Sequence, residues 1–221
     1  MTKKTRKTHK MRKVLLTVCC AALLVCVTIG ATVAYLTSTD EVVNTFTVGN
    51  VQIKLDEAKA NPDGTLVENA ARVDANSYKL LPGHTYNKDP MVTVLKGSES
   101  CYVKMTVTFT KAPELDTIFA PNGADMTSIF KGYDSNNWIA KGNTEDTENN
   151  TRTYEFWYKE AVDASKADVA LDALFDSITV PGTIDNKQLA TIDGMTITVN
   201  AYAIQADGFA DAEAAWAAYP A

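Results

Sequence analysis

Hydrophobic and polar residues alternate along most of the chain between Thr45 and Ile204. The apolar face of the longest run, 101–109, consists of Cys101, Val103, Met105, Val107 and Phe109. A second run, 195–203, has an apolar face made of Met195, Ile197, Val199, Ala201 and Ala203. A two-residue period is typical of β-strands that are buried on one face only. The pattern therefore predicts a protein built mainly from β-strands.

Turn sequences such as Pro82-Gly83 and Pro181-Gly182 separate the alternating runs. Short helices are expected only at Ala124–Phe130 and in the alanine-rich tail Asp211–Ala218, and the polar stretch Asn143–Asn150 is expected to be a hairpin tip. Seven or eight strands with so little helix predict an all-β fold. The specific expectation is an antiparallel β-sandwich of the jelly-roll type.

The N-terminal end has a different pattern. Residues 1–13 carry seven basic side chains and no acidic one, and the hydrophobic segment 14–34 that follows has no charge. This arrangement is typical of a secretory signal peptide, although 21 apolar residues are also long enough to span a bilayer. In either case the rest of the chain is expected to be exported, because the basic head stays inside.

The end of the hydrophobic segment favours cleavage. Small residues at Thr32 and Ala34 occupy positions −3 and −1 of a cut between Ala34 and Tyr35. The sequence therefore predicts a signal peptide at 1–34, removed by a signal peptidase, and a single β-sandwich domain at 35–221. An uncut signal would instead leave this domain anchored in the membrane.

Charge and cysteine content change once the first 34 residues are set apart. The whole chain has a formal net charge of −6, but the remainder has 14 basic and 27 acidic residues, a net charge of −13. Such acidity argues against nucleic-acid binding and predicts repulsion between subunits, which acid or divalent cations would reduce. Three of the four cysteines lie in the hydrophobic segment, so Cys101 has no partner for an internal disulfide.

No catalytic motif is recognisable in residues 35–221. His84 is the only histidine there, it lies in a turn, and neither HExxH nor GxSxG occurs. Cys101 opens an apolar strand face, as buried structural cysteines do. An EF-hand loop starting at Asp134 fails because Trp138 and Ile139 stand where an oxygen ligand and a glycine are required. We therefore expect no enzyme activity, metal site or cofactor, with only an irregular calcium site left open.

Three blocks of the sequence resemble the TasA/camelysin family of exported bacterial proteins. They are residues 31–57, residues 80–109 and residues 174–209, the last of which contains AYAIQ. In the first block the matching residues are Ala34, Tyr35, Asp40, Asn44, Phe46 and Gly49. The resemblance implies a jelly-roll sandwich, export from a Gram-positive cell through a dedicated signal peptidase, and assembly into fibres of the extracellular matrix of a biofilm.

The resemblance also implies a mode of assembly. In the fibres of this family, the segment after the cut site is thought to complete the sheet of a neighbouring subunit, which would make Val42, Val43, Phe46 and Val48 the strand-donating contacts here. The same segment could equally pair within its own subunit. Some camelysin relatives are called metallopeptidases, but this chain departs from that expectation because it has one body histidine and no zinc motif.

These features leave three hypotheses for the function of the protein. The first is a secreted structural protein that forms homo-oligomers or fibres, alone or with other matrix or surface proteins, and has no catalytic activity. The second is a monomeric cell-surface adhesion or ligand-binding module that uses loops such as Asn136–Asn150, with Tyr133 and Trp138 as contact residues. The third is a secreted metallopeptidase that depends on His84.

Overall fold

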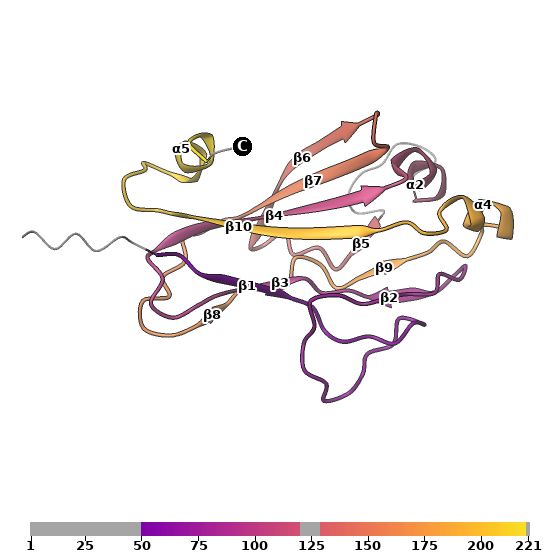
Figure 1. Ribbon diagram of the computed structural model, residues 1–221, viewed down its shortest axis with the longest axis horizontal. Coiled ribbons are helices and arrows are strands. Elements are labelled where there is room, and N and C mark those ends of the chain that lie inside the picture. Colours follow the sequence, from indigo (N-terminus) through magenta and orange to yellow (C-terminus); the bar gives the residue numbers. More distant parts are fainter. Residues whose placement is uncertain (1–49, 120–128, 220–221) are drawn as a thin grey trace, which may run out of the picture. The chain divides into compact units, whose positions relative to one another are not determined.

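The computed structural model describes residues 50–119 and 129–219, which belong to a compact unit at 48–221 (Figure 1). The predicted signal peptide at 1–34, the cut between Ala34 and Tyr35, and the donor residues Val42, Val43, Phe46 and Val48 lie outside the described residues. Among the described residues, no helix combines the length and the apolar character that a membrane span requires.

A four-stranded antiparallel sheet forms one layer. Its strands in spatial order are β10 (Ile197–Gln205), β4 (Cys101–Thr110), β7 (Thr151–Tyr158) and β6 (Trp138–Asp146). The predicted apolar face of β4 is confirmed, because its inward side chains from Cys101 to Phe109 are completely buried. Asn143–Asp146 belong to β6, so the predicted hairpin tip is shorter than expected and comprises only residues 147–150.

Two three-stranded antiparallel sheets form the other layer (Figure 1). The first contains β1 (Ile53–Asp56), β3 (Met91–Val94) and β8 (Val169–Ala170), and the second contains β2 (Thr85–Asn87), β9 (Ser177–Thr179) and β5 (Phe130–Lys131). Only Lys88–Pro90 separate β2 from β3. Pro90 has no N–H to donate to a strand ladder, which agrees with the break between the two strands at this point. The prediction of a mainly β, antiparallel fold is confirmed, although several of the ten described strands have only two or three residues.

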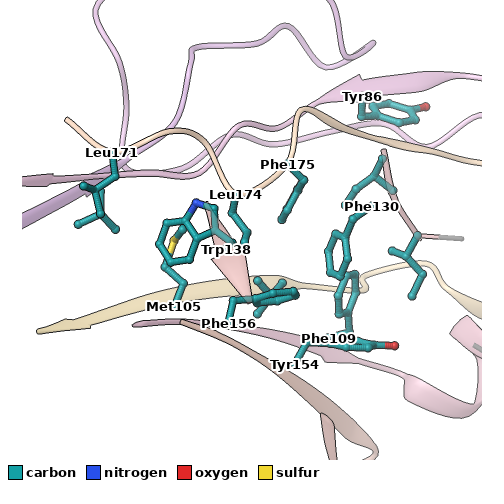
Figure 2. Close-up of a cluster of buried hydrophobic side chains, with 14 of the residues drawn as sticks. Tyr86, Met105, Phe109, Phe130, Trp138, Tyr154, Phe156, Leu171, Leu174 and Phe175 are labelled. Carbon is teal, nitrogen blue, oxygen red and sulfur yellow. The ribbon is translucent and has the colours of Figure 1, made fainter. Parts of the chain in front are cut away.

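Aromatic side chains dominate the core between the layers (Figure 2). The ring of Phe130 lies 4.5 Å from that of Phe175 and 5.6 Å from those of Phe109 and Tyr154, measured between ring centroids. Trp138 is 1 % exposed, and its indole N–H donates to the backbone oxygen of Asp172. The expectation that Trp138 contacts a partner is therefore wrong, because its side chain belongs to the core.

The described helices are short. They are α2 (Ala112–Phe119), α4 (Asn186–Thr191) and α5 (Ala212–Ala217). The predicted helix in the C-terminal tail is confirmed as α5, which begins after the N-cap Asp211. The helix expected at Ala124–Phe130 is wrong at its end, because Phe130 belongs to β5, where it pairs with Ile178; residues 124–128 lie outside the described part.

Candidate functional site

The two layers expose neighbouring edge strands. β10 pairs only with β4, and β1 pairs only with β3, within the part of the chain that the structure describes. The two strands contact each other from opposite layers. Among residues 50–119 and 129–219, one side of β10 therefore has no ladder partner. An unpaired strand edge of this kind is a template for the addition of another strand.

The apolar face of β10 is incompletely covered. Ile197 and Val199 are only half-buried, whereas the equivalent side chains of the adjacent β4, Val107 and Phe109, are fully buried. The inward side chains of β1, Ile53 among them, are half-buried as well. These apolar side chains point toward the core but still contact solvent, so the described residues cover this side of the sandwich incompletely.

A groove runs along the first half of β10. It consists of three adjoining hollows of about 600, 350 and 230 Å³. One wall of the groove is segment 74–80, and the other wall is 195–199. The residues that line two neighbouring hollows at once are Asn76, Tyr78, Leu80, Lys88, Met195 and Ile197. No backbone hydrogen bond joins β10 to segment 74–80 in the described residues. We call this feature the β10 groove.

The opposite edge of the four-stranded sheet is protected. β6 is interrupted by a register shift between Ala140 and Gly142, and a β-bulge of this kind disturbs the regular edge that an incoming strand needs. The intervening Lys141 covers the ring of Trp157 at 4.0 Å and forms an ion pair with Glu213 of α5. Charged side chains on an edge also oppose pairing. The β10 groove is therefore the better acceptor for an added strand.

A half-buried arginine, Arg72, fastens one wall of the β10 groove. The Arg72 guanidinium donates to the Asp56 carboxylate at 2.5 Å and to the Asp89 carboxylate at 2.8 Å. It also donates to the backbone oxygens of both aspartates, at 3.1 and 2.8 Å respectively. A planar guanidinium can satisfy several acceptors at once. Arg72 thus connects the start of the wall segment both to the end of β1 and to the β2–β3 junction.

The ion pair between Asp56 and Arg72 makes the stability of the fold depend on pH. Burial alone would raise the pKa of the Asp56 carboxyl, but hydrogen bonds from Lys54 and Arg72 outweigh it and lower the pKa. A lowered pKa stabilises the folded state at pH values above the unfolded carboxyl pKa of about 3.9, and this contribution is lost as the pH falls through the pKa of the folded state.

We expect the urea midpoint of the wild-type protein to drop between pH 7 and pH 3, and that of Asp56→Asn to drop less. The exposed Asp207→Asn is the control, and an equal effect of both variants would contradict the prediction.

The residues singled out for chemistry do not come together with the groove. His84 is exposed in the turn that precedes β2, as predicted. Cys101 is completely buried, and burial raises the pKa of its thiol to about 11. Tyr133 is half-buried and donates from its hydroxyl to the backbone oxygen of Trp138. Within the described ranges, no three histidine, cysteine, aspartate or glutamate side chains are grouped as metal ligands would be.

Sequence reasoning missed the residues that build the groove wall. Segment 74–80 has no two-residue or helical period, and it forms no regular element. Its position is set by distant contacts, such as the hydrogen bond from the Lys79 N–H to the backbone oxygen of Pro62.

No family model matches the chain, and neither a curated protein nor a solved structure matches it.

Proposed function

We propose that the chain is an exported structural protein of the cell surface or extracellular matrix, and that its subunits assemble by adding a strand to the β10 groove. The observation that carries the proposal is the unpaired edge of β10 beside half-buried apolar side chains. An added strand would satisfy the free backbone groups of β10 and cover those side chains. Backbone pairing then supplies affinity, and the hollows between alternate side chains supply specificity.

The segment just before β1 is the proposed donor. Val42, Val43, Phe46 and Val48 make it apolar, and cleavage between Ala34 and Tyr35 would free its other end. Residues 35–48, fully extended, span about 46 Å, which is long enough to reach the groove of a neighbouring subunit. In this proposal the added strand completes a jelly-roll sandwich, in agreement with the resemblance to the TasA/camelysin family. The acidic composition supplies solubility until subunits meet.

Changing the donor tests the proposal. The exported protein with Phe46→Asp is expected to form neither high-mass species in sedimentation nor fibres in electron microscopy, both of which the wild-type protein should form. The reason is that a carboxylate would have to be buried in the groove without a partner. Thr45→Asp is the matched control, because the neighbouring side chain of an extended strand points to the other face and can stay in water.

The outcomes separate the alternatives. A wild-type protein that starts at Tyr35 and stays monomeric at high concentration, in acid and in calcium, would contradict the proposal. That result would favour pairing of the segment within its own subunit and a monomeric adhesion module. Casein cleavage that is lost in His84→Ala would favour the metallopeptidase instead.

A further inference from the structure

Three polar side chains meet at the floor of the β10 groove. Glu57 follows β1, Lys88 follows β2, and Asn76 belongs to the wall segment. Lys88 Nζ donates to Glu57 Oε2 at 2.5 Å, and Asn76 Nδ2 donates to Glu57 Oε1 at 2.9 Å. A single carboxylate therefore holds the amine and the carboxamide next to each other, one on each of its oxygens.

The site is shielded from water. Glu57 is 4 % exposed and Lys88 is 8 % exposed. The hollow beside them is lined by apolar side chains, such as Leu55, Ile197 and Val199, and by polar ones, such as Asp74 and Thr198. A lysine amine attacks a carbonyl carbon only after it has given up a proton. Glu57 Oε2 lies within hydrogen-bond distance of Lys88 Nζ and is placed to take that proton.

The carboxamide of Asn76 is held by hydrogen bonds at both its oxygen and its nitrogen. Its Oδ1 accepts from the backbone N–H of Ala60 at 2.8 Å, which polarises the carbonyl. Its Nδ2 donates to the backbone oxygen of Ala58 at 2.8 Å as well as to Glu57. The nitrogen that would leave is thus in contact with the group that can protonate it. Nucleophile, acid–base group and polarised carbonyl are all supplied by side chains already in place.

From this geometry we propose that Lys88 and Asn76 join in an intramolecular isopeptide bond, with Glu57 as the proton carrier. Lys88 Nζ gives one proton to Glu57, attacks Asn76 Cγ and forms a new C–N bond. Glu57 passes this proton to Nδ2 and takes a second one from the attacking nitrogen, the original C–N bond breaks, and ammonia departs. It leaves as ammonium with the remaining proton, so Glu57 returns to the carboxylate and no oxidant or reductant is required.

The bond would fix the groove wall covalently. It would close the chain from residue 76 to residue 88, so that the wall segment could not separate from the β2–β3 junction even if the bonds of Arg72 broke. This inference concerns the subunit itself and does not depend on whether subunits assemble.

Tryptic mapping of the exported protein tests the bond. Cleavage after Arg72 and Lys79 releases Asn76 in peptide 73–79, and a linked Lys88 resists trypsin, so the expected product is 73–79 attached to 80–96. This branched peptide should be lighter than its two parts by one ammonia. In Glu57→Gln we expect the separate peptides 73–79, 80–88 and 89–96, whereas the exposed Glu68→Gln should keep the branched product.

Two results would overturn the proposal. One is wild-type protein that yields peptides 73–79 and 80–88 separately after prolonged incubation. The other is loss of ammonia confined to peptide 73–79 with Lys88 still cleavable, which would indicate a succinimide at Asn76 instead. Both are read from the wild-type protein, so a variant that fails to fold does not obscure the result.

Discussion

Val199→Asp is expected to abolish assembly, while Asn200→Asp is expected to leave it intact. Val199 lies on the half-buried face of β10 and lines the groove, and Asn200 is exposed on the opposite face of the same strand, outside the three hollows. A strand added over Val199→Asp would bury an unpaired carboxylate, at an effective cost of several kcal/mol. Since each 1.4 kcal/mol is a factor of ten, the concentration needed for assembly should rise by about two orders of magnitude or more.

Sedimentation at increasing protein concentration measures this effect. The two variants add the same charge at adjacent positions, so general repulsion between acidic subunits changes equally in both. The folded monomer should tolerate Val199→Asp because the side chain retains contact with solvent, and its urea midpoint checks this. Equal assembly by both variants would exclude the β10 groove as the acceptor, even if the donor segment were correct.

Phe130→Ala is expected to destabilise the fold by about 3–5 kcal/mol, the usual cost of truncating a buried aromatic side chain. Phe130 is 1 % exposed and its ring contacts four others, those of Phe109, Tyr154, Phe156 and Phe175. The cavity would open where β5 meets the four-stranded sheet, and β5 has only one other residue, Lys131, to hold its position. Urea unfolding followed by tryptophan fluorescence measures the loss.

Phe209→Ala is the control for this core variant. Phe209 is partly exposed and does not belong to the core cluster, so the same change of side chain should cost much less. Similar costs at the two positions would show that the aromatic cluster around Phe130 is not the main source of core stability.

Local patterns predicted the strands β4 and β10 and the C-terminal helix. In β4 a strict alternation over nine residues determines which face is buried, because strand periodicity and burial coincide there. In α5 the N-cap Asp211 and a run of alanines are sufficient local signals. The capping box of α4, formed by Asp185 and Gln188, was also readable but lies in a stretch with no buried helical face.

Other features depend on contacts that no local pattern contains. Phe130 is the last residue of a stretch whose sequence predicts a helix, but it pairs with Ile178, which is far away in the sequence. Trp138 is a contact residue in the hypothesis of a binding module, yet a hydrogen bond to the oxygen of Asp172 and almost complete burial place it in the core. The β10 groove arises where strands from different layers fail to close, and such a gap is a property of the assembled fold.

In the proposed assembly, the contrast between the bulged β6 edge and the open β10 edge would determine the geometry of growth. One acceptor and one donor on each subunit make the contact heterologous, so the subunits form a chain that does not close unless its rotation forms a ring. Such a chain has two chemically different tips, one with an empty groove and one with a free N-terminal segment. Elongation is then polar, and a peptide that fills the groove would cap one tip only.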